Sequence, residues 1–135
     1  MAAMAKSIAQ KLLIKPGSTV FAWPAARLGL IGELPNGMQL VDRIEVATVA
    51  VLFVDDAASA RGALEAFRDH LAKVPYLWFC YPKGGRADIN RDSLWTMLTP
   101  YGLRPITNVA IDEVWSALRF RPLTADEAKS AAGAA

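Results

Sequence analysis

Two unbroken apolar runs constrain this chain more than any other feature. Residues 47–54 read ATVAVLFV and residues 76–81 read YLWFCY, and neither run contains a charged side chain. A strand without apolar–polar alternation is typical of a parallel sheet that helices cover on both faces. Residues 57–73 lie between the runs and put four apolar side chains on one helical stripe: Ala60, Leu64, Phe67 and Leu71. Strand, helix, strand in this order predicts a right-handed parallel crossover.

The remaining elements extend this pattern in both directions. Further strands are predicted at residues 18–23, 38–41, 105–111 and 114–121, and further helices at residues 5–13, 25–31 and 90–101. The last helix should begin at a cap from Asp88 or Asn90 and end at Gly102. The predicted fold is a single Rossmann-like three-layer α/β domain over residues 1–123, with a mostly parallel sheet that closes in an antiparallel hairpin. Residues 124–135 are Ala-rich and are predicted to form a flexible C-terminal tail.

Composition limits the classes of protein to consider. A length of 135 residues suits one domain, and 53% hydrophobic with 21% charged residues indicates a folded chain. The mean hydropathy of +0.23 is high, so apolar surface should be buried on both faces of a sheet or in an oligomer. A net charge of +2 is too small to predict nucleic-acid binding. No signal peptide or membrane span is visible, so we expect a cytoplasmic protein.

Two motifs in the second half of the chain suggest a family. The segments YPKGGRADINRDSLW and VAIDEVWSALRFRP resemble those of an uncharacterised bacterial family, a domain of unknown function with a small Rossmann-like, methyltransferase-like fold. The resemblance implies that fold. It implies no substrate, cofactor or catalytic residue.

The wider comparison with methyltransferases is weaker at the first strand. Those enzymes carry a glycine-rich loop there, whereas this chain reads WPAARLG over residues 23–29, with a single glycine. Asp42 follows the predicted second strand, in the region where an acid would hold a ribose. The sequence therefore predicts no cofactor, with S-adenosylmethionine as the alternative.

The richest candidate site is the loop after the second apolar run. Lys83 and Arg86 flank Gly84 and Gly85, whose backbone N–H groups could converge on a phosphate or carboxylate. Arg91, at the start of the next helix, is the fifth candidate ligand of this anion. The alternative is a tight turn on a solvated loop, with Arg91 in an ion pair with Asp112 or Glu113.

Ligands of open α/β sheets bind beyond the carboxyl ends of the parallel strands. In the predicted fold that edge also collects the candidate pocket residues Trp23, Arg27, Asp55 and Asp112. Trp78, Trp95 and Trp115 fall on regular elements and are expected in the core. Arg119 and Arg121 share one face of the last strand, where they bind an acidic partner or protect an exposed strand from unwanted pairing.

No catalytic residues and no metal ligands are predicted. Cys80 lies inside an apolar strand, and His70, the single histidine, has no visible partner. We therefore expect a non-enzymatic domain that binds a small anionic ligand or a protein partner, and the sequence weighs against an enzyme. The alternatives are a degenerate S-adenosylmethionine-dependent methyltransferase and an oligomeric scaffold.

Overall fold

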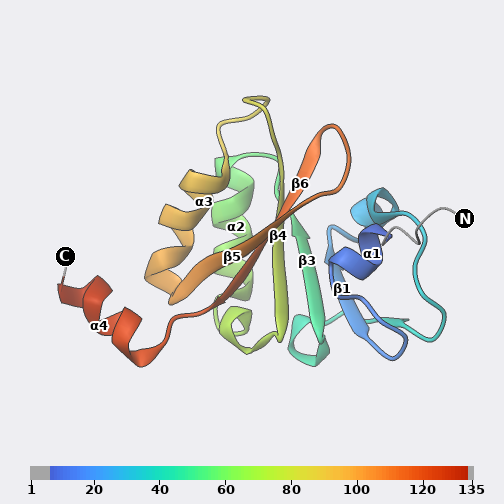
Figure 1. The fold of residues 1–135 in the computed structure, drawn as a ribbon, viewed down its shortest axis with the longest axis horizontal. Coiled ribbons are helices and arrows are strands. Elements are labelled where there is room, and N and C mark those ends of the chain that lie inside the picture. The colour runs from blue at the N-terminus through green and yellow to red at the C-terminus, as the bar shows by residue number, and fades with distance from the viewer. Residues whose placement is uncertain (1–6, 134–135) are drawn as a thin grey trace, which may run out of the picture.

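The two apolar runs form adjacent parallel strands at the centre of a six-stranded sheet (Figure 1). The computed structural model describes residues 7–133. The strands are β1 (Thr19–Trp23), β2 (Gln39–Leu40), β3 (Val49–Phe53), β4 (Tyr76–Pro82), β5 (Leu103–Ala110) and β6 (Trp115–Pro122). Their order across the sheet is β2-β1-β3-β4-β6-β5. The first four strands are parallel, and β6 lies antiparallel between β4 and β5. The predicted mostly parallel sheet with a closing hairpin is confirmed.

Helices connect the strands and cover both faces of the sheet. The α-helices are α1 (Ile8–Lys11), α2 (Ala57–Phe67), α3 (Arg91–Leu98) and α4 (Ala125–Gly133). Short 3₁₀ segments are η1 (Ala25–Ile31), η2 (Ile44–Val46), η3 (Leu71–Lys73) and η4 (Thr99–Tyr101). Asp56 caps α2 by accepting from Ser59 N at 2.8 Å, and Asn90 caps α3 by accepting from Ser93 N at 2.9 Å. Gly102 adopts the left-handed conformation, with φ of 78°, that ends the α3–η4 segment.

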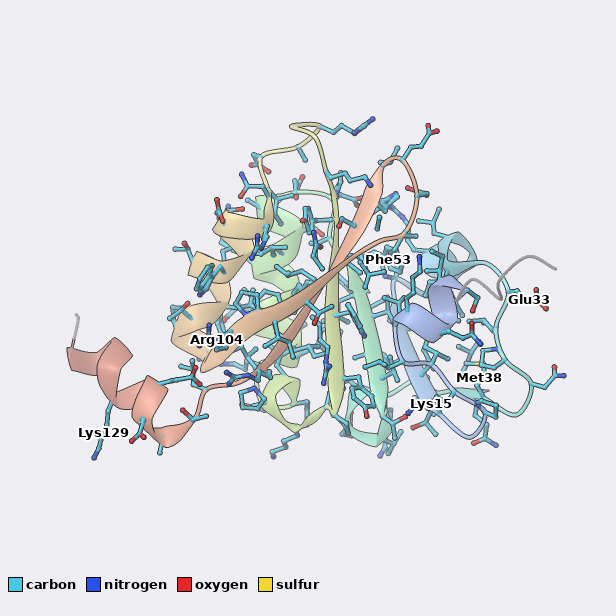
Figure 2. All side chains as sticks on the ribbon, viewed as in Figure 1. Lys15, Glu33, Met38, Phe53, Arg104 and Lys129 are labelled. Carbon is cyan, nitrogen blue, oxygen red and sulfur yellow. The ribbon has the colours of Figure 1, made fainter. Side chains whose placement is uncertain are left out.

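The sheet separates two apolar cores, because alternate side chains of a strand point to opposite faces. Ala50 and Leu52 of β3 face α2 and α3, in a core that also holds Leu64 and Leu94. Val49, Val51 and Phe53 face the other way, toward residues of α1 and η1. All five residues of β3 are at most 1% exposed, which explains why the run shows no alternation. Figure 2 shows Phe53 inside the body, with Arg104 and Lys129 toward the end from which α4 projects.

Several elements differ from the sequence prediction. The helix predicted over residues 57–73 ends at Phe67, and η3 then brings Leu71 into the core, where it is 1% exposed. The first helix covers only Ile8–Lys11, and the first two residues predicted for it, Ala5 and Lys6, lie outside the described range. The segment predicted as a tail contains α4.

The prediction that Trp95 packs in the core is wrong. Its side chain lies on the outer face of α3 and is 42% exposed, because Leu94 and Leu98 already fill the positions that face the sheet. Trp78 and Trp115 are buried as predicted. Within residues 7–133, no helix combines the length and apolar character needed to cross a membrane.

Trp78 offers a test of how the N-terminal segment is held. Its indole Nε1 donates to the carbonyl oxygen of Leu12 at 3.0 Å, in a buried position. Trp78→Phe leaves this carbonyl without a donor, so the free energy of unfolding should fall by about 1–3 kcal/mol in urea denaturation. Trp95→Phe is the matched control and should change it by less than about 0.5 kcal/mol. Equal losses in the two variants would contradict this account.

Candidate functional site

The carboxyl ends of the parallel strands lie at the edge that is uppermost in Figure 1. After β1 the chain forms β2, which lies on one side of β1 in the sheet. It then crosses back to form β3 on the other side of β1. The strand order therefore reverses between β1 and β3. In open α/β sheets a ligand binds in the crevice outside the strand ends at such a reversal.

An ion pair joins the two strand ends at this crevice. Arg27 of η1 and Asp55, which follows β3, lie with Nη2 and Oδ1 2.7 Å apart. Both side chains stay partly open to solvent, with exposures of 34% and 57%. The guanidinium carbon of Arg27 also lies 4.8 Å from the ring centroid of Trp115, at the start of β6. Of the four predicted pocket residues, the structure thus brings Arg27 and Asp55 together, with Trp115 as an unpredicted third partner.

The other two predicted pocket residues, Asp112 and Trp23, are not part of this ion pair. Asp112 holds the β5–β6 turn, where its Oδ1 accepts from the backbone N–H groups of Val114 and Trp115 at 2.8 and 2.7 Å. Trp23 points to the face of the sheet that carries α2, where its ring lies edge-on to Phe67 with centroids 5.7 Å apart.

The loop after β4 forms a turn that is closed by its own side chain. Gly84 and Gly85 both have φ of 76°, a region that side chains with a Cβ rarely adopt. Arg86 folds back over Gly84, and its Nη1 donates to the carbonyl oxygen of Lys83 at 2.8 Å. A Cβ on Gly84 would lie 2.8 Å from this Nη1. Arg91 lies apart from the turn, in the first turn of α3, where it borders a cavity of about 70 Å³ beside β5.

The same loop is tied to α2 through Asp88. Its Oδ1 accepts from the backbone N–H of Ala57, the first residue of α2, at 2.8 Å. A carboxylate at a helix N-terminus satisfies an N–H group that has no partner inside the helix. This contact fixes the loop against the strand end of β3.

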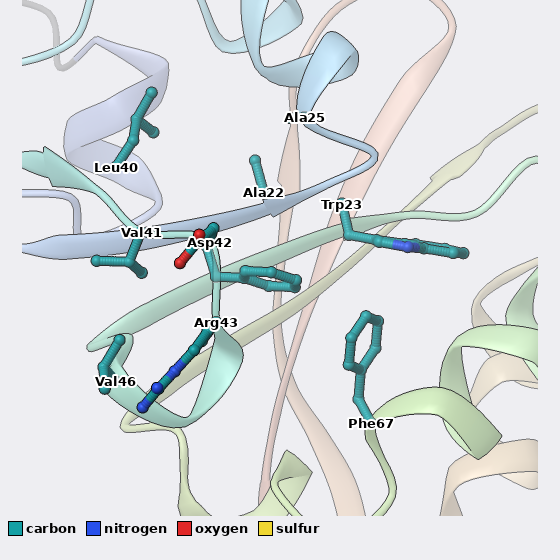
Figure 3. A pocket seen from close by; sticks show the side chains of 10 residues that line it. Ala22, Trp23, Ala25, Leu40, Val41, Asp42, Arg43, Val46 and Phe67 are labelled. Carbon is teal, nitrogen blue, oxygen red and sulfur yellow. The ribbon is translucent and has the colours of Figure 1, made fainter.

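A second hollow, a wide groove, lies on the α2 face of β1 and β2 (Figure 3). It has a volume of about 1050 Å³ and ten lining residues: Phe21, Ala22, Trp23, Ala25, Leu40, Val41, Asp42, Arg43, Val46 and Phe67. Figure 3 shows the rings of Trp23 and Phe67 at one side and Asp42 and Arg43 at the other. Asp42, the acid noted after the second strand, is thus a wall of the groove.

Sequence reasoning missed the apolar walls of this groove. Phe21 and Phe67 come from segments 46 residues apart, yet their ring centroids lie 5.3 Å apart. Val46 is 48% exposed, because η2 is too short to cover the β1–β2 side of the sheet. Leu40, on the edge strand β2, is 59% exposed. Trp23, the aromatic residue at the end of the first predicted strand, was the one sequence feature that indicated a pocket there.

Cys80 lies in the apolar interior of the sheet and is fully buried. Burial raises the pKa of its thiol far above the ordinary value, because the charged thiolate loses its hydration. Within the described part of the chain, no group of three His, Cys, Asp or Glu side chains is placed to hold a metal ion.

Asp88→Ala tests the contact that holds the loop. Loss of the acceptor for Ala57 N–H should lower the free energy of unfolding by about 1 kcal/mol in urea denaturation. Lys83→Ala is the control on the same loop, because the Lys83 side chain makes no hydrogen bond with the described residues, and it should have little effect. The account fails if both variants lose the same amount.

Cys80 should be inert in the native protein. At pH 8 a chromogenic thiol reagent should modify Cys80 at least about a hundredfold more slowly in the folded protein than in guanidinium chloride. In the folded protein the thiol of Cys80 is neither ionised nor accessible to the reagent. Similar rates in the two conditions would show that the strand is open to solvent.

Comparison with known proteins agrees with this fold. No protein-family model matches the chain, and no curated protein matches its sequence. A protein in the NADB-Rossmann superfamily from Streptococcus agalactiae superposes with a TM-score of 0.51 at 13% identity, covering 96% of this chain and 75% of that one. A "putative tRNA (m1A22) methyltransferase" from Streptococcus pneumoniae superposes with a TM-score of 0.55 at 11% identity, covering 93% and 76%.

A third solved structure is more distant. An S-adenosylmethionine-dependent methyltransferase from Aquifex aeolicus has a TM-score of 0.48 at 10% identity, covering 84% of this chain and 86% of that one. The first two structures establish a Rossmann-like fold of the kind that methyltransferases have. They lend no support to membership of a family of unknown function.

These structures correct the expectation that weighed against an enzyme. That expectation depended on the absence of a familiar catalytic constellation and of a glycine-rich first loop. The fold is nevertheless shared with a protein described as a methyltransferase, over 93% of this chain. The missing glycines are therefore no ground for excluding an enzyme.

Proposed function

We propose that this chain is a small S-adenosylmethionine-dependent methyltransferase that binds the adenosyl group of its cofactor in the groove on the α2 face of β1 and β2, which we therefore call the adenosyl groove. The observation that carries the proposal is the position of Asp42. It follows β2 and lines an apolar groove beside β1, at the edge strand pair next to the reversal of strand order. An acid at the end of the second strand is suited to accept hydrogen bonds from ribose hydroxyl groups.

The groove suits the adenosyl group in size and in chemistry. Its volume of about 1050 Å³ is at the upper end of the range of small-molecule sites. Trp23 and Phe67 supply aromatic surface for a flat purine ring. Asp42 and Arg43 are its charged lining residues, so polar groups of a ligand would be held at one side and apolar surface at the other.

The amino-acid part of the cofactor requires a partner for a carboxylate and a partner for an ammonium group. The loop after β1 has no glycine-rich turn, Pro24 lacks an N–H group, and the N–H of Arg27 donates to the carbonyl oxygen of Pro24 at 3.0 Å. The ion pair of Arg27 and Asp55 offers side chains instead. Arg27 complements a carboxylate, and Asp55 complements an ammonium group.

S-adenosylmethionine, when bound, supplies an electrophilic methyl group on a sulfonium. The residues of the chain would orient this group toward the carboxyl edge of the sheet. For the methyl acceptor we propose a molecule with an anionic group, held by Lys83, Arg86 and the N–H groups of Gly84 and Gly85. Two consecutive glycines with positive φ support this, since such a turn can aim neighbouring N–H groups at one anion.

Calorimetry with S-adenosylmethionine and S-adenosylhomocysteine tests the proposal. The wild-type protein should bind at least one of them, and Asp42→Ala should weaken binding by about tenfold or more, because a charged acceptor of two hydroxyl groups is lost. Glu33→Ala removes an exposed acid that does not line the groove and should leave the affinity unchanged.

Two results would overturn the proposal. One is the absence of binding heat for both compounds at millimolar concentration. The other is binding that Asp42→Ala leaves as tight as in the wild-type protein, which would place the ligand outside the groove.

A further inference from the structure

Three arginines gather on one face of the β5–β6 hairpin, at the end of the sheet opposite to the candidate site. Arg119 and Arg121 are two residues apart on β6 and so lie on the same face, about 7 Å from each other along the strand. Arg104 of β5 pairs directly with Arg121, which puts it on that face too. β6 runs antiparallel to β4, and its Phe120 pairs with Leu77 near the start of β4. The arginines therefore lie at the amino ends of the parallel strands.

One carboxylate contacts two of these arginines. Glu127 of α4 accepts from Arg121 through both oxygens, with Nη1–Oε1 at 2.9 Å and Nη2–Oε2 at 3.1 Å. It also accepts from Nη1 of Arg104. The two-pronged contact with Arg121 is the geometry in which arginine holds carboxylate and phosphate groups alike.

The positive charge of the group exceeds what Glu127 balances. Arg119 forms none of the ion pairs found among the described residues, and its guanidinium carbon lies 4.9 Å from the ring centroid of Tyr76. The Nε atoms of Arg104 and Arg119 are both buried without a hydrogen-bond acceptor in the described part of the chain. A buried donor without an acceptor is costly. An anion on this face would be held by the Nη groups and by the net positive charge, because the two Nε atoms are closed to solvent.

Helix α4 is held to the body through Glu127. The side chain of Glu127 is 25% exposed, whereas the other four side chains of residues 125–129 are all exposed. Thr124 completes the attachment, since its N–H donates to Glu127 at 2.9 Å and its hydroxyl accepts from Glu127 N. Figure 2 shows Arg104 at the root of α4 and Lys129 pointing away from the body. A helix anchored by one carboxylate can be displaced by an anion that competes for the same arginines.

The charge of Glu127 persists at neutral pH. Arg121 first, and then Thr124 and Arg104, hold the pKa of this carboxyl well below its ordinary range. The contact is therefore fully formed above the ordinary carboxyl pKa, and it is lost only as the pH falls through the lowered value. Protonation of Glu127 therefore does not release α4 at neutral pH, whereas an anion that binds the same arginines competes with it.

We propose that Arg104, Arg119 and Arg121 form a binding site for the phosphate groups of a polyanionic ligand, and that Glu127 of α4 covers this site as an internal competitor. A phosphate group accepts the same two-pronged hydrogen bonds as a carboxylate, and more than one phosphate would match the number of guanidinium groups. This site is separate from the adenosyl groove and does not depend on the proposed methyltransferase activity.

Binding of two probes to the full chain tests the proposal: sodium pyrophosphate by calorimetry, and a fluorescent eight-nucleotide oligo-uridylate by anisotropy. Glu127→Gln keeps the shape of the side chain and removes its charge, so it should tighten binding by about five- to tenfold, within the usual range of coupling between competing contacts. Arg119→Gln leaves the Glu127 contacts in place and should weaken binding. Arg61→Gln, at an exposed arginine of α2, is the matched control and should have no effect.

The two probes identify the source of the phosphate. Tight binding of pyrophosphate alone supports a small phosphorylated ligand. Binding of the oligonucleotide with a logarithmic salt slope that Arg119→Gln reduces by about 0.7 supports a nucleic-acid backbone. Unfolding in urea verifies that each variant is folded. If neither probe binds the Glu127→Gln protein at millimolar concentration, or if Arg119→Gln binds as tightly as the wild type, the proposal is overturned.

Discussion

The burial of β3 and β4 on both faces is the constraint on which the rest of the structure depends. A buried Val, Leu or Phe side chain contributes roughly 1.5–3 kcal/mol, and this stabilisation requires that something covers each face. Helices α2 and α3 cover one face, and α1 with η1 covers the other. Because every strand in the centre is covered twice, the sheet can present polar groups only at the strand ends and at its two outer sides.

Helices cover the α2 face of the sheet unevenly, and the groove beside β1 and β2 is the consequence. The segment between β2 and β3 contains only the three-residue η2, whereas α2 follows β3 and α3 follows β4. The α2 face of β1 and β2 is therefore flanked by Phe67 at one side only, and Val46 remains exposed there. A cleft next to the reversal of strand order is thus produced by the omission of a helix, without any specialised loop.

The two ends of the sheet differ in the way charges are arranged. At the carboxyl end, Arg27 pairs with Asp55, and Asp88 and Asp112 are used to hold backbone N–H groups. At the amino end, the hairpin register places arginines opposite one another, and a single carboxylate from α4 faces them. Matched charges suit a zwitterionic ligand, and an excess of arginine suits a polyanion.

Much of the architecture could be predicted from local patterns. The apolar runs predicted β3 and β4, Asp56 and Asn90 act as the helix caps that their residue types favour, and Gly102 ends its segment in the left-handed conformation. These features depend on neighbours a few residues away, so the sequence by itself determined them. The groove, the stacking of Arg27 on Trp115, the exposure of Trp95 and the contact of Glu127 with Arg104 join residues far apart in the chain or depend on which face a neighbour already fills. Only the tertiary structure decided these, because strand order and hairpin register determine which distant side chains meet, and no local pattern encodes that order.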